Sequence, residues 1–131
     1  MVSLFKKNFR YLRSSLNFAV RGIKYAWKTE QNFRWELFVA VLVIFCSVAL
    51  PLRPIEQLLV WLLVVWVLTL EIINTVLERM IDIIKPKKHP YVGAIKDLMA
   101  GAVLVSAVGS AIIGMILFFP YFENLILSII N

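Results

Sequence analysis

The sequence predicts an all-α integral membrane protein with three transmembrane helices and an N-terminal amphipathic surface helix. Of its 131 residues, 61% are hydrophobic, and a soluble domain of this size could not bury so much apolar surface. Long apolar runs alternate with clusters of basic residues. Because about 20 apolar helical residues cross a bilayer core, the runs are interpreted as membrane spans within one domain, residues 1–131.

Residues 4–30 predict the amphipathic surface helix. Apolar residues recur there at steps of three and four, while basic residues occupy a separate stripe. Such a helix lies in the membrane interface with its cations near anionic headgroups. The net charge of +6 is therefore assigned to an anionic membrane surface. With no recognised nucleic-acid motif, nucleic acid is excluded as a partner.

The three spans are expected at about residues 35–51, 56–84 and 96–119. Residues 98–119 carry no charge, and the run at 58–70 continues through a polar stretch to Ile84. The first apolar run is shorter, but Trp35 can anchor it at an interface. Proline at positions 51 and 54 cannot continue a helix, so the first two spans form an antiparallel hairpin.

The distribution of Lys and Arg predicts the orientation of the spans. Basic residues precede the first span and fill the second connection, whereas the first connection holds only Arg53 and residues 120–131 hold none. By the positive-inside tendency, the N-terminus and the second connection face the cytoplasm. Residues 120–131 are then expected to be a tail on the outer side.

Four polar residues share one stripe of the second span: Glu71, Asn74, Glu78 and Asp82. At about 100° per residue, the three carboxylates fall within roughly 40° of one another. Ionisable groups in a span are costly and normally face a bundle interior or a watery cavity. The stripe is therefore interpreted as a functional site, with Glu71 the deepest carboxylate.

The stripe admits four other interpretations. Asp82 and Glu78 could lie among the lipid headgroups, where an exposed charge costs little. Arg79, Lys85 and Lys96 could neutralise the carboxylates in a structural network near the cytoplasmic surface. A small oligomer that conducts protons or ions could line its path with them. That path requires polar groups along the whole span, and residues 58–70 provide none. A scaffolding subunit that uses small-residue helix contacts would leave Glu71 and Asn74 unexplained.

Further charged residues at the cytoplasmic level suit phosphoryl transfer to a membrane-embedded hydroxyl. Glu30 and Glu36 precede the first span, and Lys96 and Asp97 open the third. Mg²⁺ prefers such oxygen ligands together with water and substrate phosphates. Lysines at positions 87, 88 and 96 can meet phosphate charge. A desolvated carboxylate such as Glu71 can accept the proton of an alcohol.

Three motifs strengthen this interpretation: AWKTEQNFRWE at 26–36, ExxNTxxExxxD at 71–82, and HPxxxxxKDxxAGAV at 89–103. Together they resemble the small integral-membrane prokaryotic diacylglycerol kinase family, which includes undecaprenol kinases. The resemblance covers residues 18–114, in the same order and on the same spans. KTEQNFR looks slightly closer to the undecaprenol kinase branch.

The resemblance implies an ATP- and Mg²⁺-dependent lipid kinase of the bacterial inner membrane, a homotrimer with active sites shared between subunits. It implies that Glu71 is the general base, and that Glu30 and Glu78 hold Mg²⁺ with ATP. The other implied nucleotide contacts are Asn74, Asp82, Lys87, Lys88, His89, Lys96 and Asp97. The implied contacts of the lipid alcohol, undecaprenol or diacylglycerol, are Trp27, Phe33, Arg34, Glu36, Glu71 and Ala100.

Overall fold

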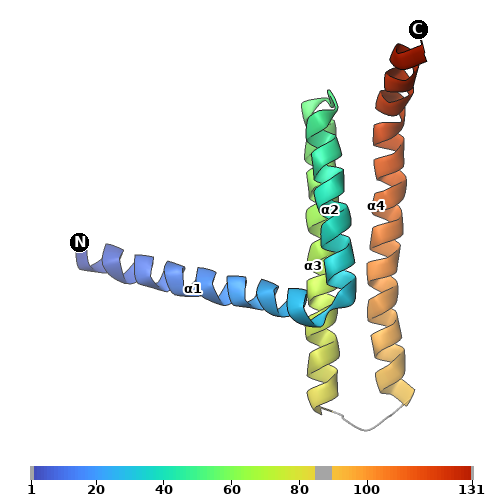
Figure 1. The fold of residues 1–131 in the computed structure, drawn as a ribbon. Helices are drawn as coiled ribbons and strands as arrows, with labels where there is room; N and C mark the ends of the chain where they lie inside the picture. The colour runs from blue at the N-terminus through green and yellow to red at the C-terminus, as the bar shows by residue number, and fades with distance from the viewer. Residues whose placement is uncertain (1, 85–89, 131) are drawn as a thin grey trace. The chain divides into compact units, whose positions relative to one another are not determined.

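The computed structural model describes residues 2–84 and 90–130, which form four α-helices (Figure 1). The helices are α1 (Val2–Thr29), α2 (Gln31–Ala49), α3 (Pro54–Ile84) and α4 (Pro90–Ile130). Neither described range contains a β-strand, so the predicted all-α class is confirmed. The chain divides into two compact units, Met1–Gln31 and Asn32–Asn131, which are described separately.

The first unit is the helix α1, as the amphipathic pattern predicts. From Tyr11 onward its apolar side chains are exposed, Leu12, Leu16 and Ile23 among them, except that of Ala26, which is buried. The guanidinium of Arg21 lies 4.5 Å from the ring centroid of Phe18. A helix that presents apolar side chains and cations in this way suits the boundary between headgroups and acyl chains.

The second unit begins with a hairpin of α2 and α3. The α3 N-terminus has one half of a capping box, in which Pro54 is the first helical residue and Glu56, the third, accepts from the N-cap residue Arg53. The Glu56 carboxylate accepts a hydrogen bond from the backbone N–H of Arg53 at 2.9 Å. Farther along, the indole Nε1 of Trp61 donates to Ser47 Oγ at 3.4 Å and joins the two helices.

Helix α4 runs antiparallel to α3, and two polar contacts define their register (Figure 1). Near the C-terminus of α3, named the inner end, Lys96 Nζ lies 2.5 Å from Asp82 Oδ1. Near the N-terminus of α3, named the outer end, the Tyr121 hydroxyl donates to the Glu56 carboxylate. The interval between these contacts is 26 residues on α3 and 25 on α4. The two helices therefore keep the same register between these two contacts.

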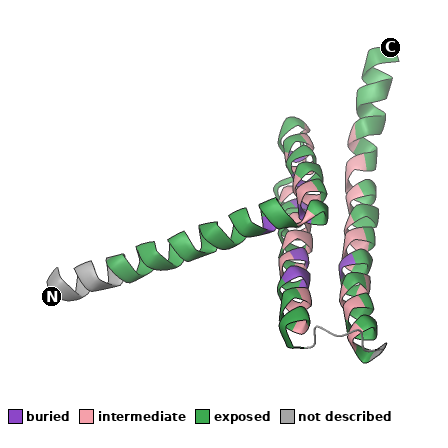
Figure 2. Cartoon of the chain, turned by 60° about the horizontal axis from the view of Figure 1, so that its bottom comes forward, coloured by how far each residue is buried: buried purple, intermediate pink, exposed green. Residues whose placement is uncertain are grey.

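Most residues of the second unit are exposed or half-buried, and few are buried (Figure 2). Of the described buried residues, as many are polar as apolar. Buried positions include Ser47, Glu56, Glu71, Asn74 and Thr75, whereas most large hydrophobic side chains are exposed. Exposed apolar surface of this extent needs lipid or another protein to cover it. Three helices are long and apolar enough to cross a membrane: Gln31–Ala49, Pro54–Ile84 and Tyr91–Ile130.

Helix α4 differs from expectation at Pro120, where a span end was predicted. The helix continues through Pro120 to Ile130. Proline removes one backbone hydrogen bond but does not oblige a helix to stop, and the next residue, Tyr121, is tied to Glu56. That residues 120–131 lie outside the membrane stays a prediction.

Small-residue contacts between helices, which a scaffolding subunit would use, can be examined at three glycines of α4. A Cβ built at Gly101, Gly109 or Gly114 would meet nothing within 4 Å among the described atoms. No helix of the described residues therefore packs closely on these glycines.

Candidate active site

The polar stripe of α3 is graded in burial, as predicted. The side chains of Glu71 and Asn74 are buried, with 4% and 8% of their surface exposed. Glu78 is half-buried, and Asp82 is exposed near the helix end. The Asn74 amide Nδ2 donates to Glu78 Oε1 at 3.3 Å, one helical turn on. The helix thus carries polar groups from its exposed inner end to a buried carboxylate.

Helix α4 brings Lys96 to the exposed end of this stripe. Its ammonium lies 2.5 Å from Asp82 Oδ1, and both side chains are partly exposed. An ion pair in such a position contributes on the order of 1 kcal/mol or less to stability. The ammonium can therefore exchange a carboxylate partner for a phosphate at little cost. Asp97 and Ala100, also predicted site residues, are exposed on the same helix.

Helix α2 brings a second carboxylate to the level of Glu71. Glu36 is half-buried, and its negative charge lies close enough to Glu71 for the two to repel. One oxygen of Glu36, Oε2, is buried without a hydrogen-bond partner in the described part of the chain. Two like charges in apolar surroundings are unfavourable, so a cation or a hydrogen-bond donor bound at Glu36 Oε2 would be stabilising.

Of the two predicted metal ligands, Glu30 and Glu78, the second unit contains Glu78, which supplies a carboxylate. Beside it, the amide oxygen Oδ1 of Asn74, a predicted nucleotide contact, is buried without a described hydrogen-bond partner. Hard oxygen donors of this kind, few in number, match the habit of Mg²⁺ to complete its shell with water and phosphate. Residues 2–84 and 90–130 hold no group of three His, Cys, Asp or Glu side chains placed to bind a metal alone.

Several predicted site residues are not brought together by the described structure. Trp27 and Glu30 belong to the first unit, where Thr29 Oγ1 donates to Glu30 Oε1 at 3.1 Å. At the start of α2, Phe33 is buried and Arg34 is half-buried. Lys87, Lys88 and His89 lie outside the described residues. The roles of all these residues stay predictions.

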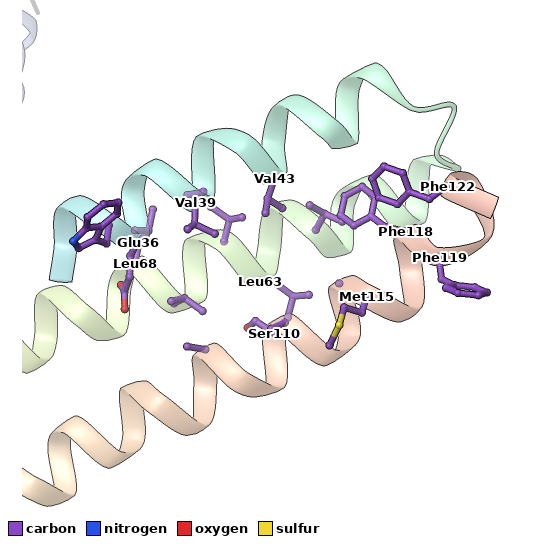
Figure 3. Close-up of a pocket in the computed structure, with 18 residues that line it drawn as sticks. Glu36, Val39, Val43, Leu63, Leu68, Ser110, Met115, Phe118, Phe119 and Phe122 are labelled. Atoms are coloured by element: carbon purple, nitrogen blue, oxygen red, sulfur yellow. The ribbon is translucent and has the colours of Figure 1, made fainter. Parts of the chain in front are cut away.

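An apolar cavity of about 720 Å³ lies between α2, α3 and α4 (Figure 3). Its walls are almost entirely apolar, and Glu36 lies at one end while Phe118 and Phe122 lie at the other. Such a space suits the hydrocarbon part of an amphiphilic molecule. The cavity could not be predicted from the sequence. Its lining residues come from three helices, and the periodicity of one helix does not reveal how the helices are rotated relative to one another.

A cluster at the outer end of α3 was also missed. Glu56 is buried, yet its carboxylate accepts hydrogen bonds from Arg53 through the backbone N–H and Nε, each at 2.9 Å, through Nη2, and from the Tyr121 hydroxyl. The hydrogen bond from the Arg53 guanidinium to Glu56, together with the attraction between their charges, raises the pKa of Arg53. The contact between Arg53 and Glu56 has a sequence signal, because Glu stands at the third helical position. The contact between Tyr121 and Glu56 has no such signal.

Comparison with known proteins supplies independent information. The sequence profile of the prokaryotic diacylglycerol kinase family matches residues 17–118. An undecaprenol kinase from Bacillus subtilis is 40% identical over 111 residues, 85% of this chain and 89% of its own length. Diacylglycerol kinases from Synechocystis and Haemophilus influenzae are 36% and 33% identical over 81% and 83% of this chain, and over 61% and 93% of their own lengths.

Proposed function

Because the chain belongs to the prokaryotic diacylglycerol kinase family, and is therefore a lipid kinase with several membrane spans, we propose that it transfers the γ-phosphoryl group of ATP to the hydroxyl of a membrane-embedded lipid alcohol. The observation that carries this proposal is the position of Glu71. It is a buried carboxylate, close to Glu36, which lies at the polar end of an apolar cavity.

Glu71 is the proposed general base. A lipid alcohol whose chain lies in the apolar cavity presents its hydroxyl at the polar end. The hydroxyl proton passes to a Glu71 carboxylate oxygen, while the alcohol oxygen forms a bond to the γ-phosphorus. The bond from that phosphorus to the bridging oxygen breaks, and its electron pair leaves with ADP. Water is excluded by the apolar walls, so hydrolysis of ATP does not compete.

The inner, more exposed part of α3 is the proposed nucleotide site. Mg²⁺ bound there would neutralise phosphate charge, and Glu78 would hold it while Asn74 lines the site. Glu30 stays the second metal ligand that the resemblance implies. We expect Lys96 to exchange Asp82, its described partner, for a phosphate oxygen. The nucleotide then approaches from the cytoplasm, in keeping with the basic residues of the N-terminus and the second connection. We propose the homotrimer that the resemblance implies, with each site shared between subunits.

Undecaprenol is the proposed acceptor in preference to diacylglycerol. The KTEQNFR stretch favours it, and so does the Bacillus subtilis relative, which is named an undecaprenol kinase. A proton or ion channel is disfavoured, because the apolar cavity wall separates Glu71 from the polar groups at the outer end.

The test is an assay of the purified full-length protein with radiolabelled ATP and Mg²⁺ in mixed micelles. One series contains undecaprenol, a second contains diacylglycerol, and a third contains neither. We expect label in the lipid phase for both alcohols, with the higher kcat/KM for undecaprenol. Label in neither alcohol would refute the kinase proposal, and a higher kcat/KM for diacylglycerol would refute the assignment of the acceptor.

A further inference from the structure

Ser106 is a polar residue of α4 that the motifs do not assign to the site. Its hydroxyl oxygen Oγ is buried and has no hydrogen-bond partner among the described residues. The same is true of two other side-chain atoms, Glu36 Oε2 on α2 and Asn74 Oδ1 on α3. Native proteins rarely leave buried polar atoms unpartnered, and such atoms call for a ligand or another explanation. Each of the three helices contributes one of them.

The register of α3 and α4 places Ser106 at the depth of Glu71. Asp82 and Lys96 are in contact at the inner end of the pair. From that contact, Glu71 is 11 residues along α3, and Ser106 is 10 residues along α4. At about 1.5 Å of rise per residue, the two positions differ in depth by only about 1.5 Å. The outer contact between Glu56 and Tyr121 confirms that the register does not slip between them.

Ser106 also lies on the face of α4 that is turned towards the other helices. It follows the buried Val103 by three residues and precedes Ser110, which lines the cavity, by four. These are the intervals that place residues on one helix face. Since Glu36 and Glu71 interact across α2 and α3, all three helices present oxygen atoms at one depth, at the polar end of an apolar cavity.

We infer that Ser106 is a binding residue for the lipid alcohol, an inference that rests on the proposed function. Its hydroxyl donates a hydrogen bond to the oxygen of the alcohol, while the alcohol O–H donates to Glu71. The alcohol is thereby held by two helices, and a lone pair of its oxygen is left to form the bond to phosphorus. Ser106 keeps its own proton throughout, and the proton of the alcohol passes to Glu71. A hydroxyl suits this task, because it can donate without bringing charge to a site that holds two carboxylates.

The test compares Ser106→Ala with the control Ser128→Ala, an exposed serine of α4 outside the cavity lining. Both substitutions remove one hydroxyl from α4, and alanine preserves the helix. In the micelle assay, we expect S106A to raise the KM for the lipid alcohol roughly three- to tenfold, the range that one neutral hydrogen bond supports. The KM for ATP should stay unchanged, and S128A should behave as the unsubstituted protein.

Three results would overturn the inference: an unchanged acceptor KM in S106A, an equal rise in S128A, or a parallel rise in the KM for ATP. Each can arise only when the unsubstituted protein transfers phosphate to a lipid alcohol. Failure of the unsubstituted protein to do so refutes the proposed function and removes the premise of this inference. The two failures are therefore distinguishable in one experiment.

Discussion

Helix α3 buries two carboxylates, Glu56 near its outer end and Glu71 in its inner half, in contrasting surroundings. Glu56 accepts hydrogen bonds from the backbone and side chain of Arg53 and from Tyr121. Glu71 lies near another carboxylate, Glu36, and one helical turn from Asn74. Around it, oxygen atoms of Glu36, Asn74 and Ser106 are buried without described partners.

We interpret the contrast as one between a structural carboxylate and the proposed general base on the same helix. At Glu56 the fold itself provides the cation and the donors, so the buried charge is balanced. Near Glu71, the buried oxygen atoms of Glu36, Asn74 and Ser106 have no described partners, so their binding capacity is left for a substrate or a cation. Burial alone does not distinguish the two residues, since both are almost fully covered.

The largest effect is expected from Glu71→Gln, compared with Glu56→Gln as a matched control. The amide cannot accept the proton of the alcohol, so phosphoryl transfer should fall by roughly 10²- to 10⁴-fold. The same substitution at Glu56 should leave the rate per folded molecule close to that of the unsubstituted protein. Initial rates in the micelle assay, with folding monitored by circular dichroism, measure both. Equal losses of activity in the two variants would abolish the distinction.

A smaller effect is expected from Lys96→Met, which removes the cation near the inner site. A charge-assisted hydrogen bond to phosphate contributes about 1.5–3 kcal/mol, so the KM for ATP should rise roughly 10- to 100-fold. The KM for the lipid alcohol should change little, since Asp82 places Lys96 at the exposed end of the stripe. Titration of ATP at saturating lipid measures the KM for ATP. Lys96→Arg should keep this KM close to that of the unsubstituted protein. An unchanged ATP KM would assign Lys96 to a purely structural ion pair.

Glu56→Gln should show its effect in stability. It leaves Arg53 without its charged partner and weakens the link between the α2–α3 turn and α4. We expect the midpoint of thermal unfolding in detergent to fall by a few degrees, while Glu71→Gln leaves it unchanged or raised. A lower midpoint for Glu71→Gln than for Glu56→Gln would reverse the assignment of structural and functional roles.

The smallest effect is expected from Tyr121→Phe, which removes one hydroxyl from the Glu56 cluster. The fall in midpoint should be smaller than for Glu56→Gln, because the bonds from Arg53 remain. Combined in one chain, the two substitutions should lower the midpoint by less than the sum of the single effects, since both break the same contact. Strict additivity in a double-mutant cycle would show that Tyr121 does not act through Glu56.

The residues that could be predicted from sequence are those whose signal is local. Apolar run lengths located the helices, and the helical period placed Glu71, Asn74, Glu78 and Asp82 on one stripe of α3. One charge pair expected of a structural network, Lys96 with Asp82, is present. Contacts between distant residues were not predictable in this way. Tyr121 meets a residue 65 positions away, and a phenol near the chain end carries no pattern that names its partner.

The length of α4 has a consequence for how the protein meets its surroundings. Its 41 residues extend for about 60 Å, roughly twice the thickness of the hydrocarbon core. No moderate tilt can immerse all of it, so one or both ends must project into headgroups or water. Tyr121 is level with the beginning of α3, so the last turns of α4 continue past the α2–α3 turn (Figure 1). In the orientation that the basic residues predict, an antibody or a protease supplied from outside an intact cell would reach these turns first.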